Sequence, residues 1–147
     1  MRFFAIWLLV VVATSMGAFA ADKESPAELA ARAESLPLEQ QPELYLKALH
    51  LELKNVDALY EQGKTEEASN GVHQIVEYAD KASDTAIRSG KKLKNAEIEI
   101  RKIGTRLKDI QHTLSFDDQA PVKAATEHLE ELSTKLLARM FSKDKKK

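Results

Sequence analysis

The sequence predicts an all-α fold: a coiled-coil-like bundle of three long helices, arranged as a long helical hairpin, with a short helix before them. Helix-forming residues dominate the 147-residue chain, which holds only 5 Gly and 4 Pro. No stretch alternates β-branched and polar residues in the manner of a strand. Small or apolar residues also recur in alternating steps of three and four, the period of a coiled-coil seam. The seam consists of Val72, Ile75, Ala79, Ala82, Ala86, Ser89, Leu93, Ala96, Ile100, Ile103, Leu107, Ile110 and Leu114.

The chain begins like an exported protein. Arg2 precedes an unbroken apolar run from Phe3 to Ala13, and Ala18-Phe19-Ala20 has the small residues of a cleavage site. This pattern predicts a signal peptide over residues 1–20, removed after Ala20, and a periplasmic or extracellular protein. The alternative is an uncleaved membrane anchor, although a membrane span needs about 20 apolar residues. Because the chain has 0 Cys, we expect neither disulfides nor a lipid anchor.

Residues 21–37 form an N-terminal segment with one short helix. Ser25-Pro26 followed by Glu28 combines an N-cap, a proline suited to a first helical turn and an acidic residue at the positive end of a helix. The pattern predicts a helix from Pro26 to Ser35. Such a helix is too short to be stable in isolation, so we expect it to dock or to fray.

The helix expected from Leu38 to Gln62 is apolar on two nearly opposite sides, which indicates a neighbour on each side. One neighbour would be the seam of residues 72–114. The other would be either the short first helix or a second protein. The candidate partner contacts are Leu44, Leu46 and Leu51.

A turn is expected at Gln62–Thr65, where Gly63 suits the left-handed position that ends a helix. Leu59-Tyr60, together with Gly63-Lys64-Thr65-Glu66-Glu67-Ala68, resembles the junction between the two helices of a tetratricopeptide (TPR) repeat. The resemblance covers one hairpin, residues 53–82, and implies two antiparallel helices joined at Gly63. As a whole, the chain resembles small exported bacterial helical proteins, a resemblance of type that implies no site residues.

The seam lies on a helix expected from about Glu66 to Leu114, and the open question is whether Ser89-Gly90 breaks it. The seam keeps its phase across Ser89, and Lys91-Lys92 offers no cap for a new helix, so we expect a continuous helix with a hinge at Ser89 and Gly90. One interior Gly costs only about 1 kcal/mol. The alternative is a compact four-helix up-down bundle that is broken at Ser89-Gly90.

A last helix is expected from about Asp118 to Phe141, with Pro121 in its first turn. It would complete a bundle domain over residues 38–141. The remaining residues, 142–147, are polar and basic and are predicted to form a disordered tail.

Charge is unevenly distributed in a chain whose formal net charge is only -1. Residues 22–67 carry eleven acidic and five basic residues, whereas residues 88–108 carry eight basic and two acidic ones. None of these eight basic residues falls on the seam, so they form either a solvated outer face or a surface for an anionic ligand. The candidate anionic-ligand residues are Arg88, Lys91, Lys92, Lys94, Arg101 and Lys102, and Arg106 and Lys108 complete the basic stretch.

The sequence contains no recognisable catalytic or metal-binding constellation. Gly63-Lys64-Thr65 matches only the end of a phosphate-binding P-loop and follows a helix instead of a strand. Asp109 and His112 would form half of a helix-bundle metal site, which needs two Glu-x-x-His sequences. With 0 Cys there is also no thiol nucleophile. We therefore expect no enzyme activity, no metal and no cofactor.

Two functions fit these patterns. The first is a non-enzymatic cell-envelope protein that acts through protein–protein contacts or self-association, using the leucines of the helix at 38–62. The alternative is a binding module for an anionic envelope ligand, using the basic stretch 88–108. The balanced net charge gives no indication of nucleic acid. Membrane contact is expected only through the N-terminal signal or anchor or through the basic tail.

Overall fold

The structure is a computed structural model that describes residues 23–144, and over this range the chain is all-α, as predicted. The short 3-10 turns η1 (Leu38–Gln40) and η2 (Phe116–Asp118) precede α2 and α5. The predicted signal peptide lies outside the described residues. The five α-helices are α1 (Pro26–Glu34), α2 (Gln41–Glu61), α3 (Thr65–Ser89), α4 (Leu93–Thr113) and α5 (Gln119–Asp144).

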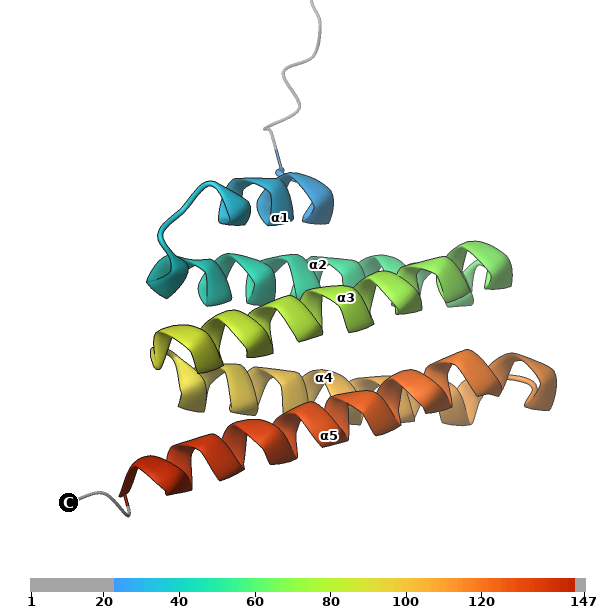
Figure 1. The fold of residues 1–147 in the computed structure, drawn as a ribbon. Coiled ribbons are helices and arrows are strands. Elements are labelled where there is room, and N and C mark those ends of the chain that lie inside the picture. Colours follow the sequence, from blue (N-terminus) through green and yellow to red (C-terminus); the bar gives the residue numbers. More distant parts are fainter. Residues whose placement is uncertain (1–22, 145–147) are drawn as a thin grey trace, which may run out of the picture.

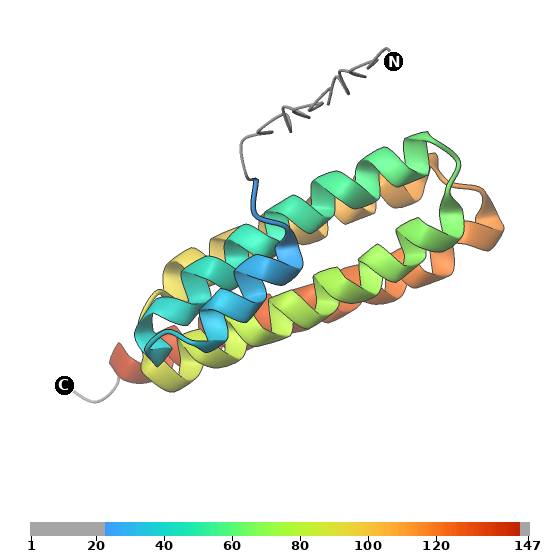
Figure 2. The ribbon, with the colours of Figure 1, turned by 90° about the horizontal axis from the view of Figure 1, so that it is seen from above.

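The helices form two stacked layers, and α1 lies over one of them (Figure 1). The antiparallel pair α2–α3 makes the first layer and the pair α4–α5 the second, with α2 beside α4 and α3 beside α5. Both views show that α2 runs in the same direction as α4, and α3 in the same direction as α5 (Figures 1 and 2). The turn from α3 to α4 therefore crosses between the layers along the diagonal of the bundle.

The two layers bury corresponding positions although their sequences differ. Most buried residues of α2 and α3 have a buried counterpart in α4 and α5 at a constant offset along the chain, so each layer uses the same pattern of inward faces. In α2 and α4 the pairs are Pro42 with Leu93, Tyr45 with Ala96, Leu46 with Glu97, Leu49 with Ile100 and Val56 with Leu107. In α3 and α5 they include Ala68 with Val122, Val72 with Thr126, Ile75 with Leu129, Tyr78 with Leu132 and Ala82 with Leu136.

A continuous helix over residues 66–114 is wrong, and the alternative, a four-helix bundle broken at Ser89-Gly90, is confirmed. Gly90 has a left-handed φ of 68° and Lys92 one of 60°, so the chain reverses between α3 and α4. No side chain caps α4. Instead, Ser89 Oγ accepts a hydrogen bond from the Lys91 N–H at 3.2 Å, which stabilises the turn.

The seam keeps its phase across this break because both helices turn the same heptad positions toward one core. Every seam residue from Val72 to Ile110 is buried except Ser89, which is half-buried, as is Leu114 at the end of the seam. The seam therefore predicts which residues are buried. It does not indicate whether these residues belong to one helix or to two.

The second apolar side of α2 is covered within the chain by α1. Leu44 and Leu46 are 9% and 3% exposed, and they belong to the same buried cluster as Leu29 and Ala33 of α1. The prediction that Leu44 and Leu46 contact a partner is therefore wrong, because intramolecular packing already occupies them. Leu51 stays half-buried.

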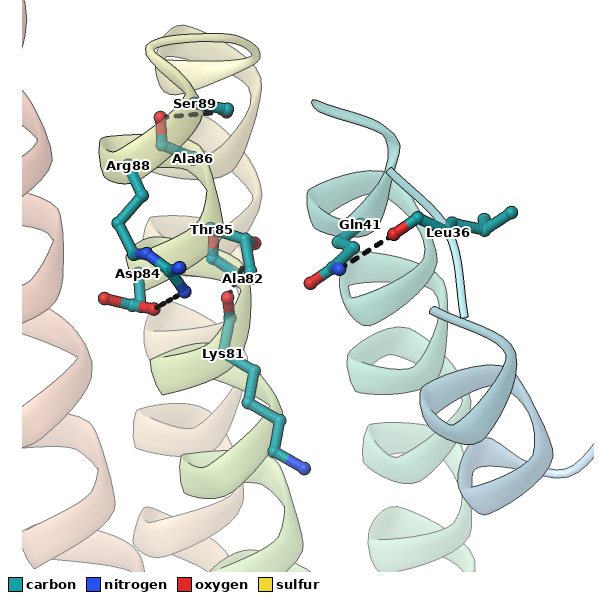
Figure 3. Close-up of polar contacts among 9 residues, drawn as sticks. All are labelled: Leu36, Gln41, Lys81, Ala82, Asp84, Thr85, Ala86, Arg88 and Ser89. Atoms are coloured by element: carbon teal, nitrogen blue, oxygen red, sulfur yellow. Dashed lines mark hydrogen bonds and ion pairs between the residues drawn. The ribbon is translucent and has the colours of Figure 1, made fainter. Parts of the chain in front are cut away.

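Side-chain hydrogen bonds mark the start of α1, α2 and α5. Ser25 Oγ accepts from the Glu28 N–H at 3.2 Å, and the Glu28 carboxylate accepts from the Ser25 N–H at 2.9 Å, a capping box that starts α1. At the start of α2, Gln41 Nε2 donates to the Leu36 carbonyl at 2.9 Å (Figure 3). The same contact recurs at the start of α5, where Gln119 Nε2 donates to the Leu114 carbonyl at 3.1 Å.

The C-terminal helix continues beyond its predicted end. Residues 142–144 belong to α5, which corrects the disordered tail predicted from residue 142, and residues 145–147 lie outside the described range. None of the helices between residues 23 and 144 combines the length and the apolar character that crossing a bilayer requires.

Candidate functional site

Half of the eight basic residues in the stretch 88–108 are held in ion pairs. Figure 3 shows Arg88 folded back one turn onto Asp84. These contacts place a carboxylate beside each cation and so reduce the positive charge that it offers to a ligand. The pairs are Arg88 with Asp84 at 3.4 Å, Arg101 with Glu97 at 2.9 Å, Lys102 with Glu99 at 3.1 Å and Arg106 with Asp57 at 2.6 Å.

The other four lysines make no ion pair with any side chain in the described range, and three of them gather at one end of the bundle. Lys91 and Lys92 form the turn between α3 and α4, and Lys94 lies in the first turn of α4. All three are exposed. Lys108 lies near the other end of α4 and is separate from them. We call Lys91, Lys92 and Lys94 the lysine turn.

The last turns of α5 expose apolar side chains at this same end. Leu137 is 36% exposed and Phe141 is 64% exposed, and their spacing of four residues places them on one face of α5. We call Leu137, Met140 and Phe141 the apolar tip. Met140 is half-buried and lines an open hollow of about 550 Å³ together with Lys92 and Lys94.

A hydrogen bond between α4 and α5 sets their register. Ser133 Oγ donates to Glu97 Oε1 at 2.9 Å. Because the two helices are antiparallel, one turn further along α5 brings Leu137 level with Leu93, at the start of α4. Phe141 lies a further turn out, level with the lysine turn. The lysine turn and the apolar tip therefore form one continuous end of the bundle.

Sequence reasoning missed the apolar tip, although a signal for it was present. The doublets Leu136-Leu137 and Met140-Phe141 each contain two adjacent large apolar residues. Adjacent helical residues point about 100° apart, so only one member of each doublet faces the core. Leu136 is fully buried and Leu137 is not.

The opposite end of the bundle, at the α2–α3 and α4–α5 turns, is acidic. Lys64 is the one basic residue within residues 61–67 and 114–119. Phe116 is 88% exposed at this acidic end, and it is the most exposed large apolar side chain in the described part of the chain. The acidic residues of these two turns are Glu61, Glu66, Glu67, Asp117 and Asp118.

Two histidines connect the two layers. His50 Nε2 of α2 lies 2.6 Å from Glu99 Oε2 of α4, and His128 Nε2 of α5 lies 2.7 Å from Asp80 Oδ1 of α3. Across the described residues, no group of three or more His, Cys, Asp or Glu side chains is placed to hold a metal ion.

A buried carboxylate lies between α4 and α5. Glu97 is only 5% exposed, and its Oε1 accepts hydrogen bonds from Arg101 Nε and Ser133 Oγ, each at 2.9 Å. These two donors satisfy the buried oxygen and tie the helices together, so Glu97 has a structural explanation. A neighbouring groove of about 430 Å³ has Arg101 and Lys108 on its α4 side and Glu130 on its α5 side.

Leu51, the remaining candidate partner contact, lines a hollow of about 430 Å³ between α1 and α2. Leu29, Lys47 and His50 line it as well. The hollow is mostly apolar, and no described segment fills it.

No protein-family model matches this chain, and no curated protein or solved structure matches it.

Proposed function

We propose that this protein is a non-enzymatic binding module whose lysine turn docks onto an anionic partner. The observation that carries this proposal is the positive charge of the turn between α3 and α4, which is unpaired among the described side chains. Lys91, Lys92 and Lys94 lie within four residues of each other, are exposed, and have no carboxylate partner among the described side chains. A cluster of exposed positive charges raises the local concentration of an anionic partner and speeds its association.

The lysine turn is a more specific candidate than the whole basic stretch 88–108. Arg101, Lys102 and Arg106 lie along α4 and are each bonded to a carboxylate. A ligand that used them would have to compete with those pairs, whereas the lysine turn is available without rearrangement. Of the predicted anionic-ligand residues, we therefore propose Lys91, Lys92 and Lys94 as the contact, with Arg88 in a supporting position.

We propose no reaction for this chain, because the buried Glu97, Thr85 and Thr126 already have structural roles. Glu97 joins α4 to α5, and the hydroxyls of Thr85 and Thr126 donate to carbonyls of their own helices. Glu97 joins two helices, and the two hydroxyls are satisfied within their own helices. These groups support a binding role more than a catalytic one.

The test compares two charge-reversal variants in binding to soluble polyphosphate. One variant carries Lys91→Glu, Lys92→Glu and Lys94→Glu, and the matched control carries Lys54→Glu, Lys64→Glu and Lys108→Glu. The three control lysines are exposed and make no ion pair with a described side chain, but they lie away from the lysine turn. Both variants change net charge by the same amount.

We expect the lysine-turn variant to bind at least tenfold more weakly than the control variant. Binding of the unchanged protein should also weaken steeply between about 0.05 and 0.3 M salt. Added salt shortens the distance over which exposed charges attract one another. Equal losses in the two variants would show that only net charge matters, and the proposed site would then be wrong.

A second candidate function is self-association through the outer face of α4–α5. Here Arg101 and Lys108 of α4 lie across a groove from Glu130 of α5. If a second copy packs on this face about a two-fold axis parallel to the helices, the basic side of α4 meets the acidic side of the partner's α5. Light scattering of Glu130→Lys against the unchanged protein tests this. A strict monomer at high micromolar concentration excludes it.

A further inference from the structure

We propose that the anionic partner of the lysine turn is the surface of a lipid bilayer, and that the apolar tip enters that surface while the lysines contact lipid headgroups. This inference rests on the proposed function and specifies its ligand. It is carried by the position of exposed apolar side chains beside exposed lysines at one end of the bundle, an arrangement that neither a soluble anion nor a bare charged polymer requires.

The apolar side chains are the first step. Phe141 is 64% exposed and Leu137 is 36% exposed on the same face of α5. Helices that lie on membranes present large apolar residues on one side and lysines beside them, so that the rings and chains enter the boundary between headgroups and acyl chains. The apolar tip and the lysine turn have this arrangement at the end of a bundle.

The register of α4 and α5 is the second step. The Ser133–Glu97 hydrogen bond aligns the two helices so that Leu137 lies level with Leu93. The lysine turn is next to that position in the chain, and Met140 lines one hollow with Lys92 and Lys94. Lys92 and Lys94 therefore lie beside the apolar tip, where they can contact the phosphates of an anionic bilayer as Phe141 enters it.

The third step is the negative charge of the opposite end of the bundle, because it determines how the bundle is oriented on a bilayer. The α2–α3 and α4–α5 turns are acidic and lie at the far end of the helices from the lysine turn (Figure 2). An anionic surface attracts the lysine turn and repels the acidic end. The long axis of the bundle would therefore be roughly perpendicular to the bilayer plane, with the lysine turn at the surface. Phe116, at the acidic end, would then face away from the lipid although it is the more exposed phenylalanine.

The experiment measures co-sedimentation with vesicles of phosphatidylglycerol and phosphatidylcholine, and with vesicles of phosphatidylcholine alone. The protein used starts at Ala21, the product expected of signal-peptide cleavage, and the full chain is run in parallel. The central comparison is Phe141→Ser against Phe116→Ser. Both changes remove one exposed phenyl ring, but only the first removes it from the apolar tip. Circular dichroism establishes that both variants are folded.

We expect Phe141→Ser to weaken binding to the anionic vesicles about tenfold and Phe116→Ser to leave it unchanged. The triple lysine-turn variant should weaken it at least a hundredfold, since each lysine near an anionic surface contributes about fivefold and each new Glu is repelled. Vesicles of phosphatidylcholine alone should bind much less of the unchanged protein.

The soluble polyphosphate measurement separates this inference from the proposed function. If Phe141→Ser leaves both vesicle and polyphosphate binding unchanged while the lysine-turn variant loses both, the membrane inference is wrong and the anion-binding function stands. If the lysine-turn variant binds both ligands as well as the unchanged protein does, both proposals are wrong. Equal losses from Phe141→Ser and Phe116→Ser would indicate non-specific hydrophobic adsorption and would also overturn the inference.

A label gives an independent measure of orientation. Because the chain has 0 Cys, Ala138→Cys and Ala120→Cys each create a unique attachment site for an environment-sensitive fluorophore. Both alanines are exposed, Ala138 beside the apolar tip and Ala120 at the acidic end. We expect a blue shift on anionic vesicles for the label at 138 and none for the label at 120. The reverse pattern contradicts the proposed orientation.

Discussion

His50 Nε2 lies 2.6 Å from Glu99 Oε2, and this contact joins α2 of one layer to α4 of the other. Burial is the largest influence on Glu99 and would raise the pKa of its carboxyl. The hydrogen bonds and charges of Lys102 and His50 together outweigh it and hold the pKa of Glu99 below the ordinary value of 4.5. The folded protein therefore favours the ionised form of Glu99.

This direction predicts how stability depends on acid. A carboxyl whose pKa is lowered by folding contributes stability above its unfolded pKa, and this contribution is lost as the pH falls through the folded pKa. For Glu99 the loss begins near pH 4.5 and continues below it. We expect the unchanged protein to be more stable than Glu99→Gln at pH 6 to 7, with the difference shrinking as the pH falls below 4.5. Urea unfolding across this range measures it, and a pH-independent difference contradicts it.

The pKa of Glu52 is shifted in the opposite direction to that of Glu99. Burial raises the pKa of Glu52 above its ordinary value of 4.5, and the hydrogen bond from Asn55 offsets this only in part. The folded chain therefore takes up a proton more readily than the unfolded chain, and stability is lost as the pH rises through the raised pKa. We expect Glu52→Gln to increase the free energy of unfolding at pH 7 and to have little effect near pH 4. Destabilisation at pH 7 would show that the charge itself is needed.

Two glycines on different helices make a matched pair for testing packing. A Cβ added at Gly71 would lie 2.5 Å from Val56 Cγ2, so α2 and α3 approach too closely for any side chain there. At Gly104, the nearest atom would be Leu129 Cβ at an ordinary 3.6 Å. We expect Gly71→Ala to destabilise the protein by about 1–3 kcal/mol through overpacking. Gly104→Ala should stabilise it by up to about 1 kcal/mol through helix propensity. Thermal unfolding of the two variants measures both effects, and equal effects contradict the packing explanation.

Heptad spacing predicted the core well because burial in a helical bundle depends on residues of one helical face. Seam residues such as Ile75, Ile100 and Leu107 are all fully buried. The same spacing could not distinguish one helix from two, because a short turn at Gly90 returns the chain to the core in the same phase. The left-handed conformation of Lys92, a residue type that rarely adopts it, was not detectable from residue preference.

Candidate contacts were harder to predict because they depend on which neighbour covers each face. The sequence predicts the apolar second side of α2 and leaves two possible neighbours for it, α1 and a second protein. The choice between α1 and a second protein requires the docked position of Leu29 and Ala33, which no local pattern encodes. In the basic stretch, ion pairs with carboxylates determine which cations are available to a ligand. Arg106 pairs with Asp57 only because α2 and α4 lie side by side.

The α3–α4 turn yields a prediction in which two substitutions have opposite signs. Gly90 and Lys92 both have left-handed backbone conformations, with φ of 68° and 60°. A non-glycine residue in this region costs about 1 kcal/mol relative to Gly. Lys92→Gly should therefore raise the free energy of unfolding by up to about 1 kcal/mol, and Gly90→Ala should lower it by a similar amount.

Lys92→Gly also separates stability from binding. It removes one of the three lysines of the lysine turn, so we expect a more stable protein that binds anionic vesicles about fivefold more weakly. Lys108→Gly is the control, because Lys108 lies inside α4, where Gly costs about 1 kcal/mol, and outside the lysine turn. Chemical denaturation and vesicle co-sedimentation of the two variants provide both measurements. Destabilisation by Lys92→Gly would mean that this lysine makes a contact in the turn that outweighs its backbone strain.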